Sequence, residues 1–599
     1  MPRREKSPMI KPIRSPRPRP RAGRSLFAGA AGVRLAALAS AAAFAASPAA
    51  AADTGARTET PIVSASTQTD VASSLVRLRV PLPAGAAPHP EACDWIQYER
   101  FRRTDGPVDA TQADAVAVLQ PGILEGATAF DPVARNTIRE AARRGKTVEV
   151  WAIDRRANCL EDKTGLEAVE RTGDASVAID YYYRGTAIDG KTFAGYRASD
   201  RVLADIGIAQ TVSDWNAVIT QELPDQAWRE RHVICGGHSL GGILTEIYAS
   251  WDFDGNPATT ADAGYRQCAG FMAFDTTLNA GVSERSPKAF KGIAGQLTAG
   301  VLEAAAKATV KSIKAGTIAR HVDLLGISPE TMNALELVGT RADQDPDGEA
   351  TAVVQAVPPR TGIETLFKLA GSPDLATWLG GKGNLRHFRY TNMALLGQNM
   401  DDNGGIYSLV RTSMGYFGGA PVQRNRLPVD TALIPGLGTL FGGGRLMLPR
   451  QQKVQQLSTW RNYDDLGTGT AQVGRGITSA ASEVTDAHDF ARILHEGPTN
   501  LTENWFPIRI VTEIGLLGAG DRSGSLRGSV HARATTRKPR LAVIAGNGLF
   551  VRQRPVDPQV VAPGYEHLDV LTAAERQNNG QPEPSSQAFA DLIDDALGS

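Results

Sequence analysis

The sequence predicts an α/β fold: a mostly parallel central sheet with helices on both faces, interrupted by a large, mostly helical insertion. Apolar β-branched runs alternate with helical segments from residue 74 to about residue 280, which is typical of a parallel sheet. The alternation then stops, and residues 281–537 are mostly helical or irregular in pattern. A strand signal returns at Leu541–Ala545, so residues 538–599 are expected to complete the same sheet.

The elements expected in the first core segment, residues 74–280, follow a regular order. Strands are expected at 74–82, 93–102, 115–119, 147–153, 232–235 and 269–274, and helices at 131–144, 214–223 and 241–250. The helix at 131–144 has the clearest bounds, because Asp131 can cap it, Pro132 suits its first turn and Gly145 ends it. The wholly apolar run at 115–119 indicates a central strand that is buried on both faces.

The overall charge excludes some classes of partner. Lys and Arg total 64, Asp and Glu also total 64, and the formal net charge is therefore zero. A chain without a basic excess offers no broad surface for nucleic acid, and the sequence contains no nucleic-acid-binding motif. We therefore expect no nucleic-acid partner.

The N-terminus has the organisation of a secretory signal peptide. A basic segment is followed by an Ala-rich apolar run and by small residues before Asp53. We expect a signal peptide over residues 1–52, export to the periplasm or the medium, and a flexible leader over residues 53–73. A membrane anchor is the alternative, but Arg34 interrupts the short apolar run. No later stretch predicts a stable membrane span.

The four cysteines suit an oxidising compartment. Cys93 and Cys159 lie at the two ends of a predicted β–α–β stretch and are expected to form a disulfide. Cys235 and Cys268 lie on two predicted strands, where they form either a second bridge or buried free thiols.

Gly237–Gly241 reads Gly-His-Ser-Leu-Gly, a G-x-S-x-G pentapeptide. The apolar run Val233–Cys235 precedes it, and the helix-like segment Ile243–Tyr248 follows it. A strand–turn–helix context is the one in which this motif presents a nucleophilic serine. Ser239 is therefore the expected nucleophile, and the N–H of Leu240 would stabilise a developing oxyanion.

Through this pentapeptide and its context the chain resembles the α/β-hydrolase superfamily, and within it the esterases and lipases. The resemblance covers residues 74–280 and 538–599, whereas residues 281–537 resemble no family and are expected to form a cap. It implies a nucleophile, an acid and a histidine in that order along the chain. It also implies a second oxyanion donor after the third core strand.

The resemblance places the catalytic histidine after the last core strand. His567 lies within Gly564–Leu571, after the apolar Val560–Val561 and before the final helical region. It is the expected base, which would take the proton of Ser239 and return it to the leaving group. His238, beside the nucleophile, is interpreted as a structural residue of the pentapeptide.

The acid has two candidates. No carboxylate directly follows Leu541–Ala545, the strand after which the acid commonly lies. The superfamily's other solution places the acid after the strand that follows the nucleophile, where Asp275 stands, and we favour this residue. Asp557 is the alternative acid. An Asp at a strand end can also serve only as a helix cap or a loop hydrogen-bond acceptor.

Ala117–Ile123 resembles the strand and turn that carry the second oxyanion donor in the superfamily, although Gln120-Pro121 replaces the usual histidine. The N–H of Ile123 would be that donor. Arg155 and Arg156 follow the next strand and are expected in a salt-bridged loop. A direct contact with substrate is their alternative role.

Together these residues predict an exported serine hydrolase that cleaves carboxylic esters through a Ser239–His567–Asp275 triad and an acyl-enzyme. The expected partner is a small-molecule or lipid ester, with no metal or organic cofactor. One alternative is an acyltransferase or amidase with the same triad. Another is a non-catalytic binding protein of the same fold, based on the missing carboxylate after Gly546. A dehalogenase or epoxide hydrolase would have Asp in place of Ser239.

Overall fold

The computed structural model describes residues 56–196, 200–282, 299–323, 326–359, 361–427, 446–466, 478–551, 557–578 and 580–598. The predicted signal peptide, residues 1–52, lies outside these ranges. Among the described residues, no helix is both long enough and apolar enough to cross a membrane.

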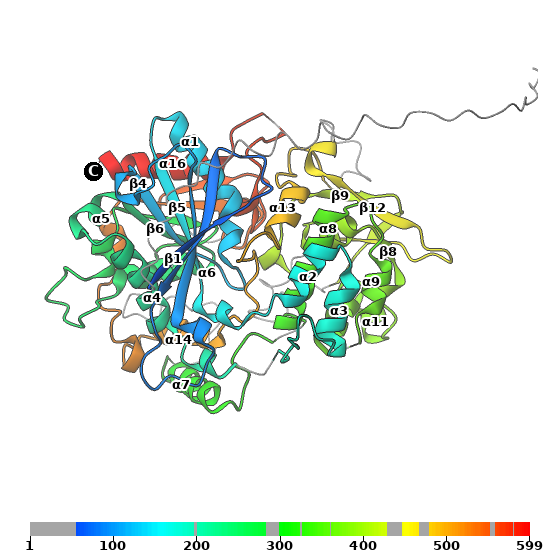
Figure 1. The fold of residues 1–599 in the computed structure, drawn as a ribbon, viewed down its shortest axis with the longest axis horizontal. Coiled ribbons are helices and arrows are strands. Elements are labelled where there is room, and N and C mark those ends of the chain that lie inside the picture. Colours follow the sequence, from blue (N-terminus) through cyan, green and yellow to red (C-terminus); the bar gives the residue numbers. More distant parts are fainter. Residues whose placement is uncertain are drawn as a thin grey trace, which may run out of the picture. The chain divides into compact units, whose positions relative to one another are not determined.

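The core is a nine-stranded sheet (Figure 1). Its strands are β1 (Arg57–Ile62), β2 (Val71–Arg79), β3 (Trp95–Arg103), β4 (Ala115–Gln120), β5 (Val148–Asp154), β6 (Val233–His238), β7 (Gly270–Phe274), β13 (Arg540–Ala545) and β14 (Gln559–Ala562). They lie in the order β1-β2-β3-β5-β4-β6-β7-β13-β14. Every pair from β5 to β14 is parallel, whereas β1, β2 and β3 join antiparallel at one edge. The predicted α/β class with a mostly parallel sheet is confirmed.

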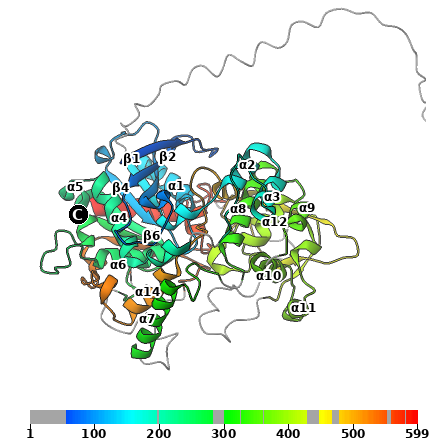
Figure 2. The same ribbon diagram turned by 60° about the horizontal axis from the view of Figure 1, so that its bottom comes forward.

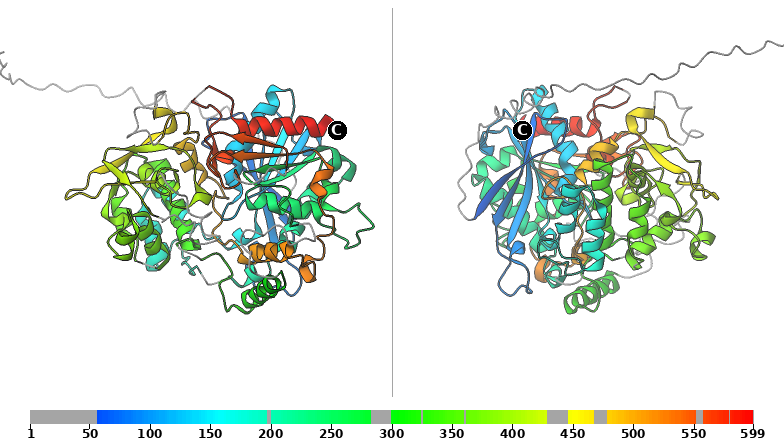
Figure 3. Two further views of the ribbon diagram at one scale, coloured as in Figure 1. Left: turned by 180° about the vertical axis from the view of Figure 1, so that it is seen from behind. Right: turned by 45° about the vertical axis from the view of Figure 1, so that its right-hand side comes forward.

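Helices cover both faces of this sheet. The helices of the core are α1 (Asp131–Arg143), α4 (Ile208–Glu222), α5 (Gln226–His232), α6 (Leu240–Ser250), α15 (Asp569–Thr572) and α16 (Pro584–Gly598). Residues of α4 and α6 pack in the hydrophobic cluster on one face, and residues of α1 and α16 in the cluster on the other. Figure 3 shows the sheet with its helices from two further sides. Along β4, Val116 and Val118 belong to the first cluster and Ala117 and Leu119 to the second. Successive strand residues point to opposite faces, so a strand covered on both faces is apolar throughout.

The segment expected to be a flexible leader is partly ordered. Residues 57–62 form β1, an edge strand that pairs antiparallel with β2. Ion pairs hold it in place: Arg57 lies 2.9 Å from Glu222 of α4, and Glu59 lies 3.2 Å from Arg100 of β3. Such cross-element charge pairs cannot be read from the Thr- and Ala-rich composition that predicted a leader over residues 53–73.

The part of the predicted cap that the structure describes contains sheets as well as helices. Its helices include α8 (Pro329–Gln344), α9 (Thr351–Ala356), α10 (Thr361–Ala370), α11 (Leu375–Leu379), α12 (Asn392–Met400) and α13 (Ala487–Ile493). Its strands are β8 (Arg389–Tyr390), β9 (Gly415–Gly418), β10 (Val422–Arg424), β11 (Met447–Pro449) and β12 (Leu457–Asn462), in sheets β8-β12-β9 and β10-β11. Aromatic packing supports the larger sheet, as in the Phe417–Trp460 pair with ring centroids 5.1 Å apart. Strands this short carry little periodicity, so the sequence did not reveal them.

The predicted boundaries of the cap also differ from the structure. Helices α2 (Thr164–Thr172) and α3 (Ala175–Arg184) follow β5, yet they share a hydrophobic cluster with residues of α8 and α10 (Figure 2). Conversely, α7 (Ala299–Ala315) and α14 (Ile508–Gly518) fall within the predicted cap and pack against each other. Residues of α14 belong to the same cluster as residues of α4 and α6.

Two disulfides join segments of the core, and no described cysteine is free. Cys93 is bonded to Cys159, as expected, which ties the turn before β3 to the turn after β5. Cys235 in β6 is bonded to Cys268 before β7, so the second bridge is the correct alternative. Disulfides of this kind are typical of proteins that fold in an oxidising compartment.

The Cys93–Cys159 disulfide closes a loop of 66 residues. We expect the double variant Cys93→Ser/Cys159→Ser to lower the free energy of unfolding by about 4 kcal/mol, because its unfolded chain regains the entropy of that loop. Denaturant unfolding of the variant and of the parent protein measures the difference. An unchanged denaturation midpoint would contradict the prediction.

Candidate active site

Ser239 lies in a sharp turn between β6, which ends at His238, and α6, which begins at Leu240. Its backbone angles are φ 51° and ψ −115°, in a region that costs a non-glycine residue about 1–3 kcal/mol. The surrounding structure holds it there, since its N–H donates to the carbonyl of Phe274 in β7 at 3.0 Å. This strained strand-to-helix turn is the geometry that exposes a nucleophilic serine at the end of a sheet.

Glycines on both sides of Ser239 let neighbouring strands approach this turn. A Cβ on Gly241 would lie 2.0 Å from the carbonyl oxygen of Gln120 in β4, and one on Gly242 would lie 2.1 Å from Thr276. Both distances are far shorter than any real carbon contact. The small residues of the motif are therefore required by packing as well as by backbone conformation.

His567 and Asp275 meet in the interior beside this turn. Nδ1 of His567 lies 2.5 Å from Oδ2 of Asp275, and both side chains are fully buried. Asp275 follows β7 directly, and its carboxylate also accepts hydrogen bonds from the backbone N–H groups of Ala545 and Leu549. The turn after β13, which has no carboxylate directly after the strand, therefore helps to hold the carboxylate of Asp275.

The environment of His567 favours a neutral imidazole. Burial, followed by the nearby His238 side chain, lowers the pKa of His567, although the hydrogen bond that its Nδ1–H donates to Asp275 acts in the opposite direction. With Nδ1 held by Asp275, the other ring nitrogen is left to accept a proton, as a general base must do.

Asp557, the alternative acid, is engaged elsewhere. Its carboxylate accepts hydrogen bonds from the hydroxyl of Thr277, the N–H of Leu278 and the side chain of Asn279. It also lies 3.2 Å from Nε of Arg540. Asp557 thus links the loop after β7 to the start of β13, and the residue that contacts His567 is Asp275.

The predicted oxyanion turn follows β4, at the same end of the sheet as Ser239. Gln120 pairs with Gly237 across the β4–β6 ladder, so Ile123 and Leu240 belong to the turns that leave two adjacent parallel strands. Arg155 holds the first turn, because its guanidinium donates to the carbonyls of Pro121, Gly122 and Glu125.

Arg155 is itself buried and paired with Glu503, which supports a structural role rather than a substrate contact. Arg156 is also buried; it pairs with Asp214 of α4 and donates to the carbonyls of Val80 and Cys93. The salt bridges expected for these two arginines are therefore present.

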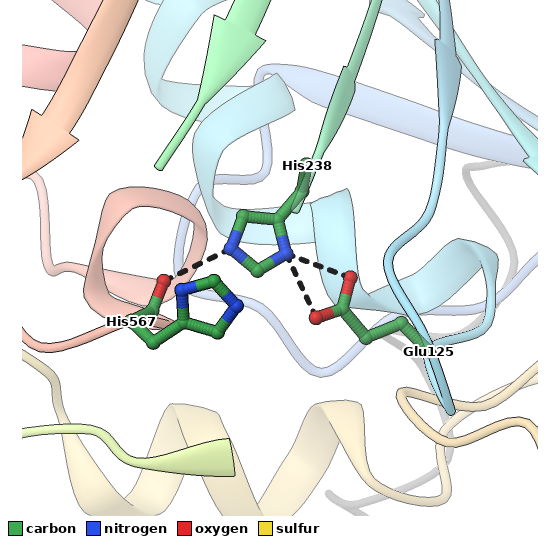
Figure 4. A group of neighbouring side chains, drawn as sticks. All are labelled: Glu125, His238 and His567. Atoms are coloured by element: carbon green, nitrogen blue, oxygen red, sulfur yellow. Dashed lines mark hydrogen bonds and ion pairs between the residues drawn. The ribbon is translucent and has the colours of Figure 1, made fainter. Parts of the chain in front are cut away.

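The surroundings of His238, which the sequence did not predict, are shown in Figure 4. Nδ1 of His238 lies 2.7 and 2.8 Å from the two carboxylate oxygens of Glu125, and Nε2 lies 2.9 Å from the backbone carbonyl oxygen of His567. Glu125 also accepts a hydrogen bond from the N–H of Gly122 at 2.6 Å. The available signal was a titratable His at the end of an otherwise apolar strand, which requires a partner once buried.

The turn that carries His567 is held by the predicted cap. The N–H of Leu568 donates to the carbonyl of Arg411 at 2.9 Å, and the carboxylate of Asp569 accepts from the N–H of Ser413 at 2.9 Å. Asp569 also accepts from the N–H of Glu566 at 2.7 Å. The sequence did not identify Asp569, because its partner Ser413 in the predicted cap is 156 positions away in the chain.

Three groups of side chains among the described residues bring possible metal ligands within 4.8 Å of one another. They are Glu125, His238 and His567; Asp252, Asp254 and Asp262; and Asp401, Asp402 and Glu483. In the first group, both ring nitrogens of His238 already contact protein acceptors. That group therefore fits a hydrogen-bonded network better than a set of metal ligands.

No protein-family model matches the sequence, and no curated protein matches it. Similar solved structures include a cold-adapted esterase from an Arctic intertidal metagenomic library, at 14% identity and a TM-score of 0.20, covering 37% of this chain and 69% of that one. Another is the juvenile hormone epoxide hydrolase of the silkworm Bombyx mori, at 9% identity and a TM-score of 0.28, covering 88% of this chain and 78% of that one. A third is a peroxisomal α/β-hydrolase of Saccharomyces cerevisiae, at 9% identity and a TM-score of 0.28, covering 91% of this chain and 89% of that one. Likeness at this level says nothing of activity. The parallel sheet and the strained turn between β6 and α6 are those of the α/β-hydrolase fold.

Proposed function

We propose that the protein is a serine hydrolase that cleaves carboxylic esters. The observation that carries this proposal is the buried contact between His567 and Asp275 beside the strained turn of Ser239. A histidine oriented by a carboxylate, next to a serine on such a turn, is the arrangement that activates a hydroxyl as a nucleophile.

In the proposed reaction, Oγ of Ser239 attacks the ester carbonyl while Nε2 of His567 takes the hydroxyl proton. The N–H groups of Leu240 and Ile123 stabilise the oxyanion of the tetrahedral intermediate. His567 then gives the proton to the leaving alcohol, which departs and leaves an acyl-enzyme. A water molecule then attacks the acyl-enzyme while His567 takes its proton. His567 returns this proton to Oγ of Ser239 as the carboxylic acid product leaves.

Two alternatives use the same fold. An acyltransferase or an amidase would use the same residues, and only the acceptor or the leaving group would differ. The alternative of a non-catalytic binding protein rests on the missing carboxylate after Gly546, whereas the contact between Asp275 and His567 supports the proposal of an enzyme. Opening an epoxide with a carboxylate nucleophile would require Asp at position 239, where this chain has Ser.

We also propose that the protein is exported and acts on a small-molecule or lipid ester. The two disulfides support an oxidising compartment, in agreement with the signal peptide expected over residues 1–52. A panel of esters of graded acyl length identifies the preferred substrate.

The triad is tested with a fluorophosphonate probe and a soluble ester. We expect Ser239→Ala and His567→Ala to abolish labelling, and Asp275→Asn to lower kcat by about 10⁴-fold, since an amide leaves the imidazole in the wrong tautomer. Asp557→Asn is the matched control and should stay within about tenfold of the parent enzyme, because Asp557 supports a loop. A large loss in the Asp557 variant with none in the Asp275 variant would reverse the assignment of the acid.

The pH profile tests the role of His567. Only the neutral imidazole can accept the proton of Ser239, so kcat/KM should be constant above the pKa of His567 and fall as the pH drops through it. Because the pKa of His567 is lowered from its ordinary value of 6.5, this acid limb should lie below pH 6.5. A limb centred above that pH would contradict the assignment.

Gly548 provides a steric test of the acid. A Cβ at this position would lie 2.3 Å from Oδ2 of Asp275, so Gly548→Ala must displace the carboxylate or the turn. We expect a loss of kcat on the order of 100-fold, the effect of a misplacement of roughly 1 Å in a catalytic group. Gly515→Ala in α14 is the control, since a Cβ there meets nothing within 4 Å. Parent-like turnover in Gly548→Ala would argue against the role of Asp275.

A further inference from the structure

We infer that Glu125 and His238 form a buried ion pair that acts as a positioning device for His567. In this inference, which rests on the proposed function, His238 is not a filler of the serine motif. It is an imidazolium that holds the backbone of the catalytic base and places a positive charge beside its ring. The pair is shown in Figure 4.

Counting donors and acceptors indicates the charge on His238. Nε2 lies 2.9 Å from the carbonyl oxygen of His567, and because a carbonyl can only accept, Nε2 must carry a hydrogen. Nδ1 faces the two carboxylate oxygens of Glu125 at 2.7 and 2.8 Å, where an ionised carboxylate can also only accept. His238 then donates from both nitrogens, which is the imidazolium form.

The surroundings of Glu125 favour its ionised form. Its Oε2 accepts the N–H of Gly122 at 2.6 Å, and a hydrogen bond of this kind stabilises a carboxylate. Burial opposes charge on both partners, but their mutual attraction outweighs it: the pKa of His238 is raised and that of Glu125 is lowered. His238 is fully buried and Glu125 is 3% exposed, so water does not weaken the pair.

The pair connects the three turns that make up the site. Glu125 binds the oxyanion turn through Gly122, and His238 is the last residue of β6, directly before Ser239. The imidazolium then fixes the backbone of His567, whose ring is held from its other side by Asp275. Catalytic groups need this kind of support, because small displacements cost large factors in rate.

The pair also acts on the charge of the base. The rings of His238 and His567 are 4.5 Å apart between centroids, at an angle of 43°. A positive charge at that distance disfavours a second one on His567, so the base stays neutral to lower pH. The positive end of the pair is the part that contacts His567, and the neutral base is the form that begins the reaction.

Other charged groups face the pair and also act on the protonation of His567. They are Asp275 at His567; Arg155 and Glu503 beside Glu125; and Arg411, Glu566 and Asp569 at the turn that carries His567. Of these, Asp275 is already hydrogen-bonded to His567, and Glu503 is paired with Arg155. The carboxylate in contact with the His238 ring is that of Glu125.

Glu125→Gln separates charge from shape. The amide oxygen can accept from Gly122 and the amide NH2 can donate to Nδ1 of His238, so one hydrogen bond to each partner is kept while His238 becomes neutral. We expect the midpoint of the acid limb of kcat/KM to shift to higher pH by roughly half a pH unit to one pH unit. The change in KM should be smaller than the change in kcat. Glu149→Gln is the matched control. Glu149 in β5 is the buried ion-pair partner of Arg100 in β3, so the loss of its charge should change thermal stability but leave the acid limb in place.

An unchanged acid limb in folded Glu125→Gln, or an equal shift in Glu149→Gln, would overturn the inference. A second measurement does not depend on turnover. In the Ser239→Ala protein with ¹⁵N-labelled histidine, NMR should show both ring nitrogens of His238 protonated at pH 6.5, the ordinary pKa of a histidine. One of them should lose its hydrogen in Ser239→Ala/Glu125→Gln.

A non-protonated ring nitrogen on His238 in Ser239→Ala would also overturn the inference. The proposed function fails in a different way, by the absence of fluorophosphonate labelling and ester hydrolysis in the parent protein. If that happens, the NMR result still decides whether the ion pair exists.

Discussion

The close approach of three strand ends is the constraint on which the rest of the site depends. β4, β6 and β7 lie side by side, and the backbone of β6 must turn sharply at Ser239 without pushing its neighbours apart. Glycines make this possible, since a Cβ on Gly237 or Gly241 would collide with the carbonyl oxygen of Gln120. The strain at Ser239 is stabilised by its hydrogen bond to β7 and by the packing of α6. The turns after β4, β6 and β7 are thereby gathered at one edge of the sheet.

The convergence of these turns brings charged groups into the protein interior. Glu125, His238, His567 and Asp275 are all buried, and burial of an unpaired charge is costly. The groups are instead joined in a chain of hydrogen bonds that runs from Gly122, in the turn after β4, to Asp275. Removing one member leaves a neighbour without its partner, so the network favours a single arrangement of the turns.

The segments outside the sheet contribute to the site by holding its turns. Arg411 and Ser413 bind the turn that carries His567, and Glu503 pairs with Arg155, which holds the turn after β4. The predicted cap therefore supports the position of the proposed base and oxyanion donor. Its small sheets, and the addition of α2 and α3 from before residue 280, follow from side-chain packing between distant segments.

Local signals in the sequence determined a large part of this picture. Apolar runs predicted most of the core strands, and Pro132 and Gly145 predicted the bounds of α1, although Phe130 and not Asp131 is its N-cap residue. The glycines around Ser239 predicted the strained turn, because these signals depend on residues close together in the chain. Only the tertiary structure decided which carboxylate contacts His567, since Asp275 lies 292 positions away and follows a different strand. The role of His238 also required the fold: its partner Glu125 is 113 positions away, and a histidine's charge depends on the acceptors that surround it rather than on its neighbours in sequence.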